Sequence, residues 1–90
     1  MKICICGGGN LGHVCAGFLA NRGHQVSIMT TRPERWNTEL EIVAPNGIFT
    51  GKLNLISSRP EEVIPQVEIV LVCLPGYAIH DELVKIRSFL

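Results

Sequence analysis

Short apolar runs alternate with stretches of helical spacing along this chain, and glycine, proline or polar residues separate them. Residues 3–6 and 69–74 are apolar at successive positions, which is typical of strands buried on both faces of a parallel sheet. Strands are therefore expected over 2–6 and 69–74, and residues 25–30 read as another. Between residues 6 and 25, apolar residues recur three and four positions apart at Leu11, Val14, Cys15, Phe18 and Leu19. This spacing predicts an amphipathic helix packed on the sheet.

Two further helices are expected in the second half of the chain. Residues 57–67 predict a short one, with Ser58 and Glu61 as its capping box. The last helix carries an apolar stripe at Ile79, Leu83, Ile86 and Leu90. Each of these helices follows a strand, so the two kinds of element alternate along the chain.

The middle of the chain predicts a β-hairpin. Asn46-Gly47 lies between the short apolar runs 40–44 and 48–50, and Asn-Gly in such a place is a strong hairpin signal. Residues 33–36 are compatible with one helical turn that begins at a proline, and 52–56 with a third strand of the sheet.

Together these patterns predict an α/β fold of the doubly wound type. It has a mainly parallel sheet, helices on both faces and an added β-hairpin. Right-handed crossovers give the parallel strands the order 3-2-1-4. A ligand crevice is then expected beyond the carboxyl ends of the first and fourth strands.

A glycine-rich turn occupies one of those ends. The segment Gly7-Gly8-Gly9-Asn10-Leu11-Gly12 follows the first strand, precedes the first helix and reads G-x-G-x-x-G. In this context the first glycine permits a tight turn, the second lets a pyrophosphate approach bare backbone, and the third lets helix and strand pack closely. Amide groups at the start of the helix would face the ligand's negative charge. The turn therefore predicts a Rossmann-type dinucleotide-binding domain.

A P-loop is excluded, because His13-Val14 stands where Lys-Ser/Thr is needed.

The residues after the second strand indicate which dinucleotide is bound. No Asp or Glu occurs there before Glu34. The segment instead supplies two hydroxyls, of Thr30 and Thr31, and the guanidinium groups of Arg32 and Arg35. A 2′-phosphate would repel a carboxylate and pair well with arginine. We therefore expect NADP(H) in preference to NAD(H), and the missing acid also disfavours FAD. The alternative is that both arginines are solvated loop residues.

Several single residues admit two interpretations. Asn10 is either a helix cap or a cofactor contact, and His13 is either structural or close to the pyrophosphate. Tyr77 is a candidate for shaping the pocket at the nicotinamide end, and His80 is expected to be exposed to solvent. Trp36 either stacks on adenine or packs under the hairpin. The sequence shows no nucleophile with its base, no carboxylate pair and no metal cluster, so no catalytic residue is predicted.

Composition limits the remaining possibilities. The 90 residues suffice for one domain, and their net charge of 0 does not favour nucleic-acid binding. No apolar run reaches the roughly 20 residues of a membrane span, and the start of the chain does not resemble a signal peptide. Four cysteines lie inside apolar runs, which indicates buried, reduced thiols and a cytoplasmic location.

These motifs, taken together, resemble the amino-terminal domain of the NAD(P)-dependent opine dehydrogenases of the octopine and nopaline type. The resemblance covers nearly the whole chain and rests on residues 7–13, 16–20, 22–26 and 70–80. The wider group of 6-phosphogluconate-dehydrogenase-like enzymes, including ketopantoate reductases and glycerol-3-phosphate dehydrogenases, shares much of this pattern. Leu11 departs from it, since many opine dehydrogenases have glycine there.

The resemblance implies a cofactor site. It places Gly7, Gly9, Asn10, Leu11 and Gly12 at the pyrophosphate; Thr31, Arg32 and Arg35 around the adenosine ribose; and Leu74, Pro75 and Gly76 along the path to the nicotinamide.

The resemblance also implies the activity of a full-length enzyme. Such enzymes join an amino acid to a 2-oxo acid and reduce the resulting imine with a hydride from NAD(P)H. A second domain, absent from residues 1–90, would bind the substrate, so we expect this chain alone to bind cofactor without turnover. A homodimer is a further expectation. A non-catalytic dinucleotide-sensing module remains the alternative from another functional class.

Overall fold

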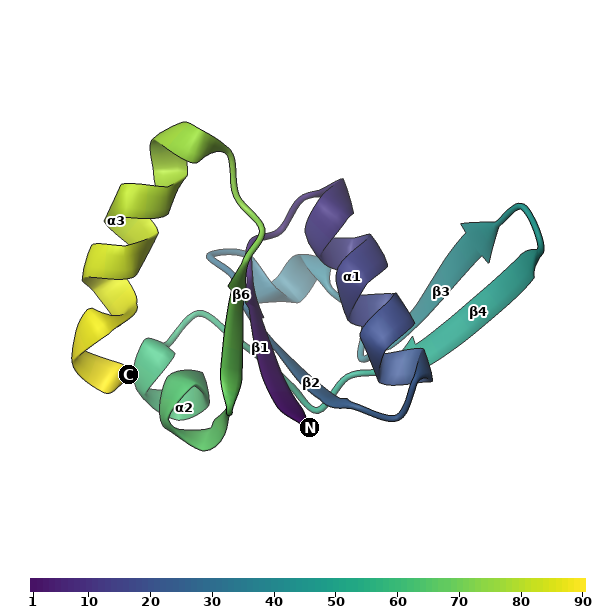
Figure 1. The fold of residues 1–90 in the computed structure, drawn as a ribbon, viewed down its shortest axis with the longest axis horizontal. Helices are drawn as coiled ribbons and strands as arrows, with labels where there is room; N and C mark the ends of the chain where they lie inside the picture. The colour runs from purple at the N-terminus through teal and green to yellow at the C-terminus, as the bar shows by residue number, and fades with distance from the viewer.

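The computed structural model describes residues 1–90, which form two sheets flanked by helices (Figure 1). The elements in chain order are β1 (Lys2–Cys6), α1 (Asn10–Asn21), β2 (Gln25–Met29), β3 (Glu39–Ala44), β4 (Gly47–Lys52), β5 (Leu55–Ser57), α2 (Pro60–Val63), β6 (Ile69–Val72) and α3 (Gly76–Ile86). Three short 3₁₀ turns cover Pro33–Arg35, Ile64–Gln66 and Arg87–Phe89.

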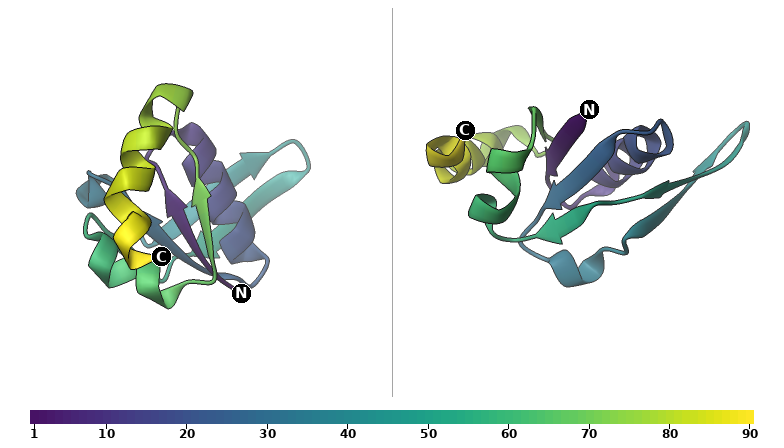
Figure 2. Two further views of the ribbon diagram at one scale, coloured as in Figure 1. Left: turned by 60° about the vertical axis from the view of Figure 1, so that its left-hand side comes forward. Right: turned by 90° about the horizontal axis from the view of Figure 1, so that it is seen from below.

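The larger sheet has four parallel strands in the order β5-β2-β1-β6, which confirms the predicted α/β fold and strand order. Helix α1 and the hairpin lie on one side of this sheet, while α2 and α3 lie on the other (Figures 1 and 2). Successive residues of β1 therefore enter different cores. Ile3 and Ile5 join the cluster that contains Trp36, and Cys4 and Cys6 join the opposite one.

The predicted hairpin is present as β3 and β4, and it packs closely against α1. Its two-residue turn is Pro45-Asn46, and Gly47, with φ +145°, begins β4. The turn is therefore one residue earlier than a turn centred on Asn46-Gly47. A side chain on Gly51 of β4 would lie 2.5 Å from the Gly17 carbonyl oxygen of α1. The absence of that side chain lets strand and helix make backbone contact.

The apolar stripe predicted for α1 is wrong at three of its five positions, while Cys15 and Leu19 are half-buried and pack against the core. Leu11, Val14 and Phe18 are exposed, and the buried face of the helix consists of small residues: Gly12, Ala16 and Gly17. Helix α1 lies so close to the sheet and the hairpin that only small residues fit on its buried face. Larger apolar side chains therefore point toward solvent.

Two boundaries in the second half also need correction. Lys52 belongs to β4, so the third parallel strand begins only at Leu55 instead of covering 52–56. The helix predicted over 57–67 is a single α-turn followed by a 3₁₀ turn.

The predicted capping box of that helix is also wrong. Arg59 is the N-cap and makes no side-chain cap bond. Ser57, one residue before the predicted Ser58, accepts a hydrogen bond from the Arg59 N–H at 3.0 Å and donates to Glu62 at 3.1 Å.

Strand β6 is shorter and less buried than the 69–74 run predicted. It ends at Val72, and Ile69 and Leu71 are exposed because β6 is the edge strand of the sheet and α1 crosses β1 and β2. Helix α3 ends at Ile86, before the last residue of its predicted stripe, Leu90. Ile86 is buried as expected, but Leu83 and Leu90 are exposed.

The contact between helix and hairpin generates the first prediction. Gly51→Ala will lower the free energy of unfolding by about 2 kcal/mol, because the new Cβ meets the backbone of α1, which cannot move aside as a flexible side chain would. Urea denaturation measures the effect. Gly76→Ala is the matched control: its Cβ would meet nothing within 4 Å, so stability should be unchanged or slightly higher. Equal stability of the two variants would contradict the close packing of β4 on α1.

Candidate functional site

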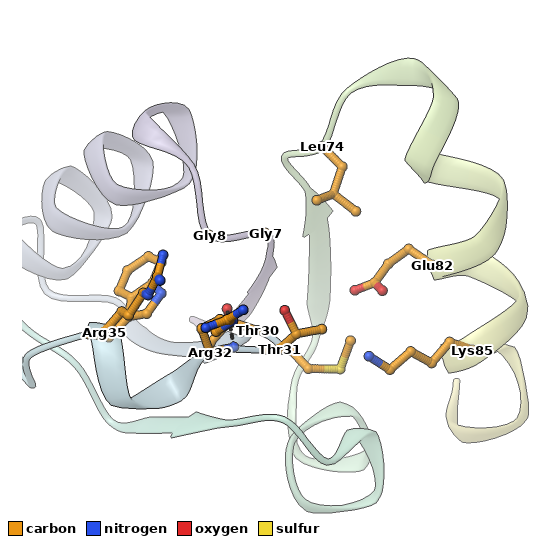
Figure 3. A pocket seen from close by; sticks show the side chains of 11 residues that line it. Gly7, Gly8, Thr30, Thr31, Arg32, Arg35, Leu74, Glu82 and Lys85 are labelled. Atoms are coloured by element: carbon orange, nitrogen blue, oxygen red, sulfur yellow. Dashed lines mark hydrogen bonds between the residues drawn. The ribbon is translucent and has the colours of Figure 1, made fainter.

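A crevice opens at the carboxyl ends of the central strands. The chain leaves β1 through the glycine turn and leaves β6 through Leu74-Pro75, and α1 and α3 both begin at this end of the sheet (Figure 1). A cavity of about 180 Å³ lies here (Figure 3). Its lining residues are Gly7, Gly8, Met29, Thr30, Thr31, Arg32, Arg35, Trp36, Leu74, Glu82 and Lys85. The cavity lies where the parallel topology predicts a ligand.

The three motif glycines have different surroundings. Gly7 has φ +137°, and a side chain there would collide with the Cys73 carbonyl oxygen. At Gly12 a Cβ would lie 3.4 Å from the Gly7 carbonyl oxygen, so this glycine permits close packing of helix and strand. At Gly9 a Cβ would meet nothing within 4 Å. Only the space beside Gly9 is therefore open for another molecule.

The start of α1 offers unpaired amide groups. Gly9 is the N-cap residue, without a side-chain cap bond, and the first turn contains no acidic residue. The interpretation of Asn10 as the cap is therefore wrong. The first-turn N–H groups of Asn10, Leu11 and Gly12 have no partner within the helix, and the helix dipole adds positive potential at this end. Leu11 presents its backbone here, while its side chain is exposed. These features suit an anion such as a diphosphate.

The segment after β2 forms one wall of the cavity. The buried Thr30 hydroxyl accepts a hydrogen bond from the Arg32 N–H at 3.2 Å, which turns the chain directly after the strand. The 3₁₀ turn Pro33–Arg35 then follows. As a result Thr31, Arg32 and Arg35 all line the cavity (Figure 3).

The cavity thus brings together five of the predicted site residues: Gly7, Thr31, Arg32, Arg35 and Leu74. Six others lie outside its lining. Gly9, Asn10, Leu11 and Gly12 form the start of α1, and Pro75 and Gly76 form the start of α3. Their predicted contacts with pyrophosphate and nicotinamide remain predictions.

The aromatic residues near the turn are arranged in an unexpected way. His13 stacks on Trp36, with ring centroids 3.6 Å apart and planes 10° from parallel. The His13 Nδ1 also lies 3.0 Å from the Gly9 carbonyl oxygen. Trp36 is 7% exposed and packs with Leu40 of the hairpin. The packed interpretation of Trp36 and the structural one of His13 are confirmed, and adenine stacking on this indole is ruled out.

Tyr77 and His80, which follow β6, do not line this cavity. Tyr77 is 88% exposed and does not line it. His80 is exposed, as expected.

Helix α3 contributes two charged residues that sequence analysis missed. Glu82 and Lys85 lie three positions apart, and their side chains point from α3 toward the segment after β2 (Figure 3). The cavity lining therefore holds three cations (Arg32, Arg35 and Lys85) and one carboxylate, a net of +2. The signal that could have indicated them is their place on the helix that follows β6, the strand beside β1. Gly8 and Met29 were also missed as lining residues, and the Thr30 hydroxyl noted after the second strand belongs to a residue of the lining as well.

The cysteines are all free. Cys4 and Cys6 are buried, whereas Cys15 and Cys73 are only half-buried, so the prediction of four buried thiols holds for two. The Cys6 pKa is raised far above its ordinary value by a hydrogen bond with Cys4, by burial and by the charges of Cys4 and Glu82. The Cys73 pKa is raised by burial and by Cys15.

Neither a metal-binding cluster nor a membrane-spanning helix is found in this chain. No three His, Cys, Asp or Glu residues converge so as to hold a metal ion. None of the helices has the length and apolar content needed to cross a membrane.

Comparison with known proteins gives consistent matches. Residues 2–89 match the family model described as "NADP oxidoreductase coenzyme F420-dependent". An opine dehydrogenase of Haliotis discus hannai is 29% identical over 100% of this chain, and a glycerol-3-phosphate dehydrogenase [NAD(P)+] of Chlorobium phaeobacteroides is 34% identical over 90%. A solved octopine dehydrogenase, described with NADH and L-arginine, superposes with a TM-score of 0.87 at 25% identity over 99% of this chain. The chain spans 26% of the length of each of these three proteins.

The raised pKa of Cys6 predicts a loss of stability at alkaline pH. Above its ordinary value of 9.0 this thiol ionises in the unfolded chain but stays protonated in the folded one. The unfolded state then binds fewer protons, so the free energy of unfolding falls by about 1 kcal/mol per pH unit. Urea denaturation between about pH 7.5 and 10 will show this decline, and Cys6→Ala will reduce its slope. Parallel pH profiles for the two proteins would show that Cys6 does not cause it.

Proposed function

Since this chain belongs to the family described as coenzyme F420-dependent NADP oxidoreductases, we propose that it is the dinucleotide-binding domain of an opine-dehydrogenase-like enzyme that prefers NADP(H). The observation that carries the proposal is the open backbone at Gly9, directly before the unpaired amide groups of α1. Diphosphate oxygens need hydrogen-bond donors without side chains in the way, and this turn offers both.

The preference for the 2′-phosphorylated cofactor rests on charge. The lining of the cavity carries a net charge of +2, with Arg32 and Arg35 directly after β2. In a diphosphate-binding Rossmann domain this is the end that receives the adenosine ribose. Arginine pairs with phosphate through a planar fork of donors, so two arginines at this place favour a 2′-phosphate over a hydroxyl. The cavity of about 180 Å³ is smaller than a whole-ligand pocket, which suits one end of a dinucleotide.

The reaction we propose is the one that relatives suggest. Matched proteins are named opine dehydrogenase and octopine dehydrogenase, and one solved structure is described with L-arginine. The corresponding activity is hydride transfer from NAD(P)H to an imine or keto group of a substrate built from an amino acid and a 2-oxo acid. The nicotinamide supplies the hydride when it is bound. The residues of this chain hold the diphosphate and the adenosine ribose, and a further domain would hold the substrate.

Cofactor preference is tested by removing the arginines. Arg32→Gln and Arg35→Gln will each weaken NADPH binding roughly tenfold or more, and NADH binding far less, because a charged hydrogen bond to the 2′-phosphate is lost. Isothermal titration calorimetry measures all four affinities. Arg87→Gln, in the exposed C-terminal 3₁₀ turn, is the control. Tighter binding of NADH than NADPH by the unmodified chain would refute the preference for NADP(H). The same titrations with FAD and ATP test other nucleotides.

Access to the diphosphate is tested at Gly9. Gly9→Ala will weaken NADPH and NADH alike by at least about tenfold, because the methyl group occupies the space that the diphosphate needs. The backbone at Gly9 has φ −86°, which alanine adopts readily, so the melting temperature should not fall. A variant that binds both cofactors as tightly as the unmodified chain would place the diphosphate elsewhere.

A further inference from the structure

The indole N–H of Trp36 is a hydrogen-bond donor without a partner in the protein. The residue is 7% exposed, and its Nε1 donates to no side chain or backbone group. Only one side-chain polar atom, the Nδ1 of His24, is fully buried without a hydrogen-bond partner. The Trp36 Nε1 also lacks a partner, so it is not fully buried and still reaches an open space. Burying an unpaired donor costs about 1–3 kcal/mol, and buried Trp N–H groups usually find an acceptor.

That open space is the cavity beside the glycine turn. Trp36 lines it together with Gly8. A Cβ placed on Gly8 would lie 3.2 Å from the Thr30 hydroxyl oxygen and 3.9 Å from the Trp36 Nε1. Gly8 is not one of the three motif glycines, yet its missing side chain keeps these two polar groups accessible. The cavity therefore has a polar floor of one hydroxyl and one indole N–H, with Arg32 and Arg35 beside it.

The indole is held firmly in this orientation. His13 stacks on it at a centroid distance of 3.6 Å, and the Nδ1 of the same imidazole lies 3.0 Å from the Gly9 carbonyl oxygen. A carbonyl only accepts, so Nδ1 carries the proton and donates. One imidazole thus connects the indole to the turn that we propose for the diphosphate. Little side-chain freedom remains to be lost when a ligand binds.

We infer that the Trp36 N–H donates a hydrogen bond to the 2′-oxygen of the adenosine ribose, carried by a hydroxyl in NAD(H) and by the phosphate in NADP(H). His13 acts as the positioning residue for the indole. The inference rests on the proposed cofactor site and adds to it a contact from a buried neutral donor. Indole nitrogen donates but never accepts, so it suits either oxygen and bonds more strongly to the charged one.

Trp36→Phe tests this directly, since phenylalanine keeps an aromatic ring beside His13 and removes the N–H. Calorimetry compares NADPH, NADH and an NADH analogue whose adenosine ribose lacks the 2′-oxygen. We expect the substitution to weaken NADPH about tenfold and NADH about threefold, and to leave the analogue unchanged. An equal loss for all three ligands would mean that Trp36 only shapes the cavity, and no loss for any of them would remove it from the site. Either result overturns the inference.

Two further experiments separate the possible failures. If Trp36→Phe does not fold, as judged by circular dichroism, the tryptophan is replaced by benzothienylalanine, an isostere with sulfur in place of N–H, and the same pattern is required. His13→Ala should reproduce the ligand-dependent loss in weaker form, and His13→Phe, which restores a stacking ring, should recover most of it. Failure of the unmodified chain to bind any of the three ligands would refute the proposed function, whereas normal binding with an unselective Trp36→Phe refutes this inference alone.

Discussion

The contact between Gly7 and the Cys73 carbonyl oxygen is the constraint on which the rest of this site depends. It brings the chain leaving β1 against the chain leaving β6, at a distance that admits no side chain. Because β1 and β6 are parallel neighbours, both helices that follow them start at the same edge of the sheet. The crevice between the two starts is therefore a consequence of one backbone contact and of the positive φ that glycine permits there.

Small residues also allow close backbone approach elsewhere in the molecule. Gly12 brings α1 close to the turn, and Gly17 and Gly51 bring the hairpin onto α1. The hairpin in turn contributes Leu40 to the cluster that buries Trp36, and the Trp36 indole stacks on the His13 imidazole. Packing on the hairpin side of α1 thus fixes the orientation of an indole that faces the cavity on the other side. The site is assembled from the glycine turn, the segment after β2 and helix α3, which are far apart in the sequence.

Much of this arrangement could be predicted from the sequence, for physical reasons. Buried parallel strands are apolar at every position, and a glycine turn between strand and helix has few structural alternatives, so strand order and crevice follow from local patterns. The sequence indicates that Ala16 and Gly17 allow close approach to the sheet, but it also presents a stripe of larger apolar residues on α1, and only the tertiary distance shows that the small residues form the fully buried face. The hydroxyl that accepts the hydrogen bond from the Arg59 N–H belongs to Ser57 and not to Ser58, and the sequence does not distinguish the two neighbouring serines as acceptors. Placing Glu82 and Lys85 in the cavity requires the strand order in addition to helical spacing. The stacking of His13 on Trp36 depends on how separate elements meet, which no local pattern encodes.

The central claim is that backbone amides at the start of α1 bind the diphosphate of a nicotinamide dinucleotide. Its most direct test is an NMR titration of this 90-residue chain, labelled with ¹⁵N, with NADPH. The account predicts that the amide signals of Gly9, Asn10, Leu11 and Gly12 shift most and saturate together, with the dissociation constant that calorimetry gives. Saturable binding that leaves these four amides unmoved, while signals on another face shift, would contradict it.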